Sequence, residues 1–243
     1  MQWTDVDDYQ QGIGEIHIPN AAVLHCVVSY GGVAQYHGWL ADPSTFQNPR
    51  RGVYEIFDDK LEILKDFITK QGRGRDARDL EAGIAWLLWM LGFSVAYLGG
   101  TQRTQDAADL IATTPHGHFA IIECTTGTLR TENKLPLLVA RAETARQRLA
   151  ASNQSPIHVL PVMVTSRTES EIKADIEHAE RLGVLVLSRE QLDRIVNQTL
   201  VTPNTNQLYD EAEAAVRAAQ AKYPAQATVQ RPLPTAGAGS VTE

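Results

Sequence analysis

Two carboxylates interrupt apolar runs that are otherwise typical of buried strands. Asp109 lies in the run at residues 108–113 (ADLIAT), and Glu123 lies in the run at residues 119–124 (FAIIEC). Residues 114–117 (TPHG) between them are typical of a short turn. A hairpin of this kind brings both acids to one edge of a sheet, where isolated carboxylates would be costly to bury. A divalent metal ion shared by the pair is the simplest way to stabilise them.

A third carboxylate belongs to a helix that the spacing predicts over residues 77–91. Glu81 lies on the same face as apolar residues three and four positions apart. Because that face points to the core, the Glu81 carboxylate either ends at the rim of the sheet or reaches into a polar site. The residues that share its face are Ala77, Ile84, Leu88 and Leu91.

Each of these features also has a structural explanation without chemistry. Asp109 can be an acid at a strand start, and Glu123 can pair with a buried arginine. Residues 125–127 (TTG) can form a strand end with a bulge. His116 and His118 lie near the turn, where solvation is the alternative to metal ligation.

The order of motifs along the chain resembles the PD-(D/E)xK nuclease superfamily, and most closely its restriction-endonuclease-like branch of the Mrr type. The resemblance covers residues 76–198. The segments that carry it are Glu81 in a helix, Gly92-Phe93 before a strand, Gly99-Gly100, residues 106–112 (DAADLIA) and residues 121–125 (IIECT).

The resemblance implies a metal-dependent endonuclease that hydrolyses DNA phosphodiester bonds in defence or DNA processing. It assigns Mg²⁺, or Mn²⁺ in its place, to the carboxylates of Asp109 and Glu123 and to the backbone carbonyl of Cys124. It also gives Glu81 an assisting role, through a second metal ion or a water.

The sequence departs from the family pattern at one position. The family has a lysine two residues after the glutamate, and this chain has Thr125 there. A threonine supplies a hydroxyl but no charge. Lys134 and Arg130 are the nearby cations that could replace the lysine, and Lys134 is the better candidate because it begins a predicted helix.

A polyanion requires a local basic surface, because the formal net charge is −7 and gives no overall attraction to nucleic acid. DNA is the partner that the resemblance implies. The expected contacts to its phosphates are Arg103, Arg130, Arg141 and Arg148. Lys134, Arg141 and Arg148 are seven residues apart and share a helix face, which fits either phosphate contacts or a solvated, salt-bridged surface.

Two other functions remain open from the sequence. The missing lysine at Thr125 favours a catalytically inactive relative that acts as a nucleic-acid-binding or protein-docking module. The third possibility is a subunit that is active only together with another chain.

The alternation of predicted strands and helices indicates an α/β fold with a mixed central sheet flanked by helices, as in restriction endonucleases. A small β-rich N-terminal unit ending in a helix is expected over residues 1–72, and the nuclease domain over residues 73–200. A C-terminal helix at 201–222 and a flexible tail at 223–243 follow. The N-terminal unit can serve recognition, homodimer formation or docking of a protein partner.

Composition places the chain among globular proteins, with 243 residues and 43% apolar content. Cys26 and Cys124 form no spaced metal motif, and the N-terminus is polar and acidic, so we expect a cytoplasmic protein. Residues 82–102 carry no charge, but glycines interrupt them, and a helix followed by a strand explains the segment better than a membrane span.

Overall fold

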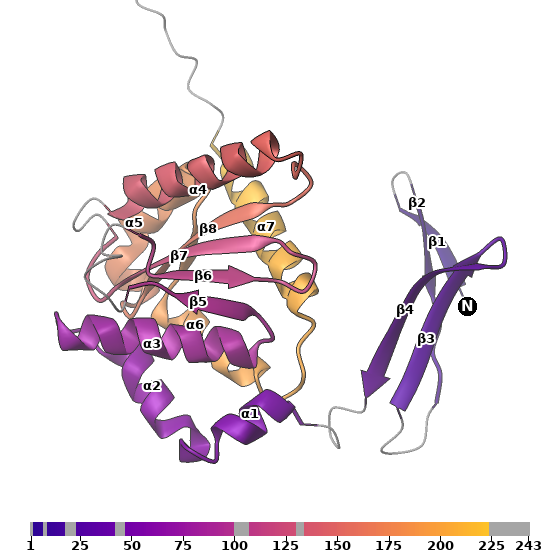
Figure 1. Cartoon of the computed structure of the whole chain (residues 1–243), viewed down its shortest axis with the longest axis horizontal. Helices are drawn as coiled ribbons and strands as arrows, with labels where there is room; N and C mark the ends of the chain where they lie inside the picture. The colour runs from indigo at the N-terminus through magenta and orange to yellow at the C-terminus, as the bar shows by residue number, and fades with distance from the viewer. Residues whose placement is uncertain are drawn as a thin grey trace, which may run out of the picture.

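A five-stranded mixed sheet with helices on both faces forms the main body of the protein (Figure 1). The computed structural model describes residues 2–6, 9–17, 23–41, 47–99, 107–129 and 134–223. This architecture confirms the α/β class with a mixed sheet that the sequence predicts.

The sheet has the strand order β5-β6-β7-β8-β9. Strand β6 is antiparallel to both of its neighbours, β5 and β7, whereas β7, β8 and β9 run parallel to one another. The strands span Ser94–Tyr97 (β5), Leu110–Thr113 (β6), Phe119–Thr125 (β7), Val159–Thr165 (β8) and Leu185–Leu187 (β9).

Strand β7 lies in the centre of the sheet and is buried on both faces. Ile122 belongs to the hydrophobic cluster on one face and Ile121 to the cluster on the other. Because side chains alternate along a strand, a residue near the end of β7 is buried whichever face it points to. Glu123 is buried for this reason, with 3% of its surface exposed.

One face of the sheet is covered by helices from both halves of the chain. Helix α3 (Arg75–Met90) packs there with its apolar face, and α2 (Glu62–Thr69) packs against α3. The short helices α1 (Pro49–Tyr54) and η1 (Asp59–Leu61) precede α2, and α6 (Arg189–Gln198) and α7 (Thr205–Ala221) cover the rest of this face. A capping box of Ser188 and Gln191 begins α6.

The other face is covered by α4 (Lys134–Ala151) and α5 (Glu169–Arg181). These helices connect the parallel strands, α4 between β7 and β8 and α5 between β8 and β9. A crossover helix begins near the edge where its preceding strand ends. The start of α4 is therefore close to the carboxyl end of β7.

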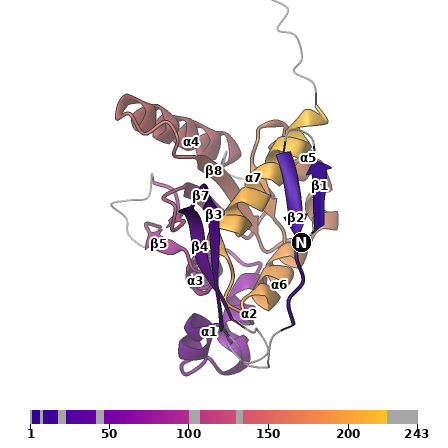
Figure 2. The same ribbon diagram turned by 90° about the vertical axis from the view of Figure 1, so that its right-hand side faces the viewer.

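The N-terminal residues form two separate two-stranded antiparallel sheets (Figure 2). Strand β1 (Gln2–Val6) pairs with β2 (Tyr9–Ile13), and β3 (Val23–Tyr30) pairs with β4 (Val33–Ala41). Gly31 and Gly32 join β3 to β4 with φ angles of 58° and 80°, which glycine adopts without strain.

The division at residue 72 stays a prediction. Leu64 and Ile68 of α2 belong to the same hydrophobic cluster as Leu80 and Ile84 of α3. The predicted tail lies outside the described residues from position 224 onward. No helix among the described residues is long and apolar enough to cross a lipid bilayer.

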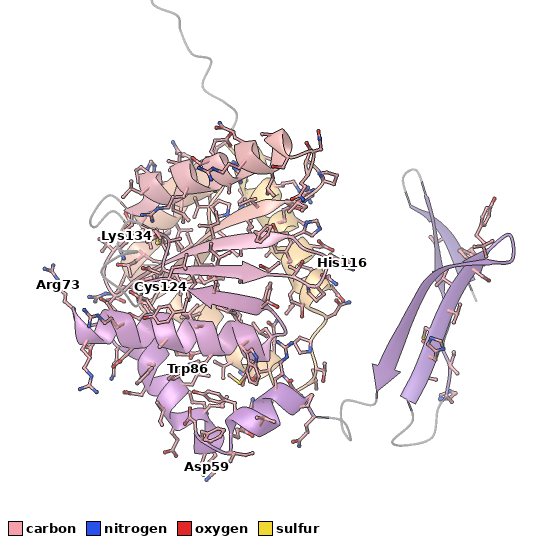
Figure 3. All side chains as sticks on the ribbon, viewed as in Figure 1. Asp59, Arg73, Trp86, His116, Cys124 and Lys134 are labelled. Atoms are coloured by element: carbon pink, nitrogen blue, oxygen red, sulfur yellow. The ribbon has the colours of Figure 1, made fainter. Side chains whose placement is uncertain are left out.

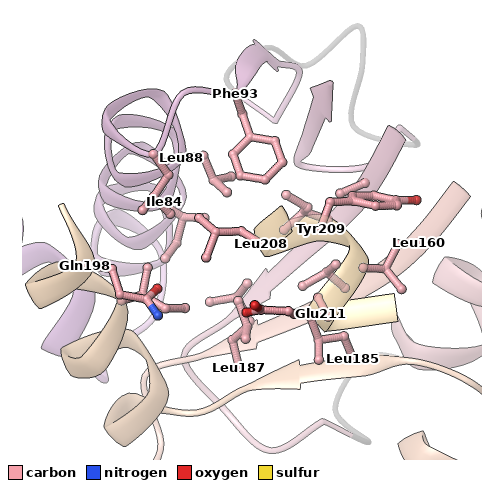
Figure 4. A pocket seen from close by; sticks show the side chains of 17 residues that line it. Ile84, Leu88, Phe93, Leu160, Leu185, Leu187, Gln198, Leu208, Tyr209 and Glu211 are labelled. Carbon is pink, nitrogen blue, oxygen red and sulfur yellow. The ribbon is translucent and has the colours of Figure 1, made fainter. Parts of the chain in front are cut away.

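An apolar cavity of about 330 Å³ lies between the sheet and the helices α3, α6 and α7 (Figure 4). Leu88 and Phe93 contribute to one side of it, and Leu185 and Leu187 to the sheet side. Gln198 and Glu211 are the polar and charged residues that accompany this apolar lining. The helices on this face therefore leave space that larger side chains can fill.

Candidate active site

The predicted acids meet where β6 begins and β7 ends. Leu110 of β6 pairs with Ile122 of β7, so Asp109 and Glu123 occupy the next positions along the two strands. One carboxylate oxygen of Asp109, Oδ2, accepts a hydrogen bond of 2.7 Å from the backbone N–H of Cys124. Asp109 is thereby fixed against the strand that carries Glu123.

Glu123 is paired with a cation from α4. The Arg141 guanidinium donates a short hydrogen bond to Glu123 Oε1, so Glu123 does pair with an arginine, although Arg141 itself is partly exposed. Burial nevertheless raises the pKa of Glu123 to about 7, and the nearby charge of Asp109 adds to the increase. Arg141 and Lys134 oppose this shift without cancelling it.

Lys134 lies beside both strands at the first turn of α4 (Figure 3). Its ammonium nitrogen donates a hydrogen bond of 2.8 Å to the carbonyl oxygen of Cys124 and lies 3.9 Å from Asp109 Oδ2. The structure thus places the cation of Lys134 next to the acids. At the motif position, the Thr125 hydroxyl accepts a hydrogen bond of 3.1 Å from the N–H of Gly127, which stabilises the strand end.

Glu81 extends from α3 toward the same region. Its Oε2 accepts a hydrogen bond of 3.0 Å from the hydroxyl of Tyr97 on β5, and 8% of the residue is exposed. Burial, followed by the charge of Asp109, raises the pKa of Glu81. Burial and the adjacent Glu81 also raise the pKa of Tyr97 to about 12, so the phenol keeps its proton and remains a donor.

Gly99 lies between the carboxylates of Glu81 and Asp109, where there is no room for a side chain. A Cβ atom at this position would lie 2.6 Å from Glu81 Oε2 and 3.2 Å from Asp109 Oδ1. The N–H groups of Leu98 and Gly99 both donate to the carbonyl of Asp109, at 2.9 and 3.0 Å. The close approach of the two carboxylates therefore depends on a glycine here.

The donor chemistry of these groups fits a hard cation such as Mg²⁺. Asp109, Glu123 and the Cys124 carbonyl supply oxygen ligands, which Mg²⁺ prefers. Within the described residues, no group of three or more His, Cys, Asp or Glu side chains is placed to hold a metal ion, so water would complete the coordination. Lys134 and Arg141 already donate to the Cys124 carbonyl and to Glu123, so an incoming metal ion would displace them from these oxygens.

The four predicted DNA contacts have different positions. Arg141 pairs with Glu123, and Arg148 is exposed farther along α4. Arg103 and Arg130 lie outside the described residues. The role of all four in DNA binding stays a prediction.

Two further basic residues lie near the acids, in addition to the four expected phosphate contacts. Arg73 precedes α3, and Arg167 follows the end of β8. Both line a cavity that also contains Thr125 and Lys134. Parallel neighbouring strands end at one edge of a sheet, so the position of Arg167 two residues after a predicted strand was a usable signal. Tyr97, at the end of a short predicted strand, carried no comparable signal.

The two histidines near the predicted turn lie at the other end of the sheet. Figure 3 shows His116 at the end opposite Lys134 and Cys124. His118 packs between the rings of His158 and Tyr209, and its Nδ1 accepts a hydrogen bond from the N–H of His158. The structure thus separates these histidines from the acids.

Comparison with solved structures gives a distant likeness in fold. No protein-family model matches the sequence, and no curated protein matches it. The fold is similar to that in a solved structure of the restriction endonuclease FokI bound to DNA, with a TM-score of 0.40 and 16% sequence identity. The similarity covers 62% of this chain and 28% of that chain, so the present chain corresponds to well under half of that enzyme.

Proposed function

We propose that the chain is a metal-dependent endonuclease that hydrolyses DNA phosphodiester bonds. The observation that carries the proposal is the convergence of Asp109, Glu123 and Lys134 at one edge of the sheet. Two carboxylates with a lysine beside them combine ligands for a hard cation with a donor for phosphate oxygen.

In this proposal, Asp109 and Glu123 hold Mg²⁺ or Mn²⁺ together with the carbonyl of Cys124. The bound ion would activate a water and offset the charge that develops on the phosphate. Asp109 is already oriented for this task, since Cys124 N–H holds one of its oxygens. Glu81, held by Tyr97, lies on the far side of Gly99 and is suited to orient a water.

Lys134 takes the role of the lysine that Thr125 replaces. Its ammonium reaches the strand end from the first turn of a helix, which is a rigid support. When substrate binds, the same ammonium can donate to a phosphate oxygen and stabilise the transition state. Thr125 contributes to the shape of the strand end, because its hydroxyl binds Gly127 N–H.

The proposal is tested by plasmid cleavage. Purified chain is incubated with supercoiled DNA and Mg²⁺ or Mn²⁺, and nicked and linear products are measured against Asp109→Ala. Cleavage by the wild type that the variant and EDTA both abolish supports the nuclease. Equal cleavage by the wild type and Asp109→Ala contradicts it.

A second candidate is a catalytically inactive binding module. The observation in its favour is the pairing of Glu123 with Arg141, together with the bond from Lys134 to the Cys124 carbonyl. These two cations occupy oxygens that a metal ion requires. DNA binding without cleavage, with either metal, would select this candidate.

For the N-terminal unit we propose contact with a second copy of the chain or with a protein partner. The β3–β4 hairpin exposes apolar side chains, among them Val28 at 57% and Val33 at 62%. Exposed apolar surface of this kind is typical of interaction sites. Val28→Asp combined with Val33→Asp is expected to make a dimer monomeric in sedimentation, and cleavage that requires an added partner would indicate docking instead.

A further inference from the structure

A cavity of about 180 Å³ lies beside the acids, where the start of α3, the end of β7 and the residues after β8 come together. Its volume equals that of about six water molecules, enough for a phosphate group with some of its hydration. The lining residues that matter here are Arg73, Thr125, Thr126, Lys134 and Arg167.

The charge in this cavity is of one sign. Arg73, Lys134 and Arg167 line it, and no carboxylate is among its described lining residues. Asp109 and Glu123 are not among the lining residues, although Cys124 is. A positive cavity therefore adjoins the acids, and Lys134 belongs to both.

Arg167 is held in place by the protein around it. Its Nε donates to the carbonyl of Thr126 at 2.9 Å, and its NH1 donates to Gln71 Oε1 at 3.0 Å and to Glu171 Oε1 at 3.2 Å. In the described part of the chain, its second terminal nitrogen, NH2, forms no hydrogen bond. A guanidinium fixed on one side can offer its remaining donors to an anion at little entropic cost.

Thr126 adds a neutral hydroxyl to the cavity lining. The residue is 6% exposed and lines the cavity, and its hydroxyl has no hydrogen-bond partner within the described ranges. Among the buried side-chain polar atoms of the described residues, Ser166 Oγ is the one without a hydrogen-bond partner, so the Thr126 hydroxyl is accessible from the cavity rather than enclosed. A hydroxyl at the wall of a positive cavity is suited to donate to an anionic oxygen.

We propose that this cavity binds one phosphate of the substrate strand, next to the phosphate that is cleaved. That the DNA strand is a substrate rests on the proposed nuclease function. Arg73, Thr126 and Arg167 bind the neighbouring phosphate, and Lys134 lies between it and the scissile one. The contact is to the backbone alone, so it positions DNA without reading its sequence.

The first test measures DNA binding in EDTA, where no cleavage occurs. Fluorescence anisotropy with a labelled 20-base-pair duplex gives Kd over a range of salt concentrations for the wild type, Arg73→Gln and Thr126→Val. Arg217→Gln is the matched control, because Arg217 is an exposed arginine on α7. The Arg73 side chain forms no hydrogen bond or ion pair with the rest of the described chain. We therefore expect Arg73→Gln to fold as the wild type does, so that a change in Kd reports on DNA binding.

We expect Arg73→Gln to raise Kd by about 5-fold to 10-fold and to reduce the slope of log Kd against log salt by about one. Thr126→Val should raise Kd by a smaller factor, about threefold, with an unchanged salt slope, since it removes a neutral donor. Values equal to those of Arg217→Gln for both variants overturn the proposal.

A second measurement separates this site from a pocket for free anions. Orthophosphate is added to the wild type and to Arg167→Gln, and Tm is recorded. A rise in Tm for the wild type alone, together with the weaker DNA binding of Arg73→Gln, supports a site for backbone phosphate. A rise in Tm with unchanged DNA affinity means that the cavity takes a free anion, and the proposal is overturned.

The outcomes for this site and for the nuclease are distinguishable. Asp109→Ala is expected to bind DNA in EDTA as the wild type does while losing cleavage. If no protein cleaves but Arg73→Gln still weakens binding, the phosphate site stands and the nuclease fails. If the wild type cleaves and Arg73→Gln changes neither Kd nor KM, the nuclease stands and the phosphate site fails.

Discussion

The ammonium nitrogen of Lys134 lies 2.8 Å from the carbonyl oxygen of Cys124, the residue that follows Glu123. A lysine from the next helix thus reaches the carboxyl end of β7, which Thr125 completes. The same ammonium is 3.9 Å from Asp109 Oδ2. Cation and acids therefore form one group, although they come from three segments of the chain.

Lys134→Met should lower the single-turnover rate of plasmid nicking by about 100-fold or more, because it removes a charged donor at the phosphate. Lys173→Met, an exposed lysine on α5, is the control and should keep the parental rate. Parental cleavage by Lys134→Met would show that the helix lysine does not replace the motif lysine.

Glu123 should make the stability of the protein depend on pH near neutrality. Its pKa rises from 4.5 to about 7 on folding, so its contribution to stability is fully present below pH 4.5 and is lost as the pH increases through 7. Between pH 5 and 8, the free energy of unfolding of the wild type should fall relative to Glu123→Gln by roughly 2 kcal/mol.

Urea unfolding in EDTA at both pH values measures this difference. A difference between wild type and Glu123→Gln that stays constant from pH 5 to 8 would contradict the raised pKa.

Removal of Arg141 should destabilise the fold more than removal of an exposed arginine from the same helix. Arg141→Ala leaves the buried Glu123 carboxylate without its guanidinium partner, which costs about 2–3 kcal/mol at pH 8. Arg148→Ala should stay within about 0.5 kcal/mol of the wild type. The loss in Arg141→Ala should shrink at pH 5, where Glu123 is protonated, and equal losses in the two variants would argue against the ion pair.

The apolar cavity under α7 should accept a larger side chain. Ala212 lines it, so Ala212→Leu fills part of the space and should raise the free energy of unfolding by about 1 kcal/mol. Ala218→Leu makes the same change at an exposed position of the helix and should have little effect. A lower Tm for Ala212→Leu would mean that the helices already fill the cavity by closer packing.

Much of the main domain was predictable because its strands and helices follow strong patterns. The buried run of β7 and its turn from β6 place Asp109 beside Glu123 by pairing alone. The apolar stripe of α3 likewise places Glu81 on the inner face. Periodicity and turn residues are local features of the sequence. They are sufficient to predict where the three acids lie.

Which basic side chains lie beside the acids depends on packing between elements that are distant in the sequence. Sequence patterns do not predict this packing. Arg141 and Arg148 share a face of α4 two turns apart, so the position of each along the helix decides that Arg141 reaches Glu123 while Arg148 is exposed. The parallel pairing of β8 with β7 decides that Arg167 lies near Thr126. From spacing alone, Arg141 and Arg148 are equally good candidates for phosphate contacts.

The most direct measurement of the central claim is a calorimetric titration of Mn²⁺ into the chain with duplex DNA present. We predict one bound ion per chain in the wild type and its loss in Asp109→Asn. Binding that is the same in both proteins would contradict a metal site formed by Asp109 and Glu123.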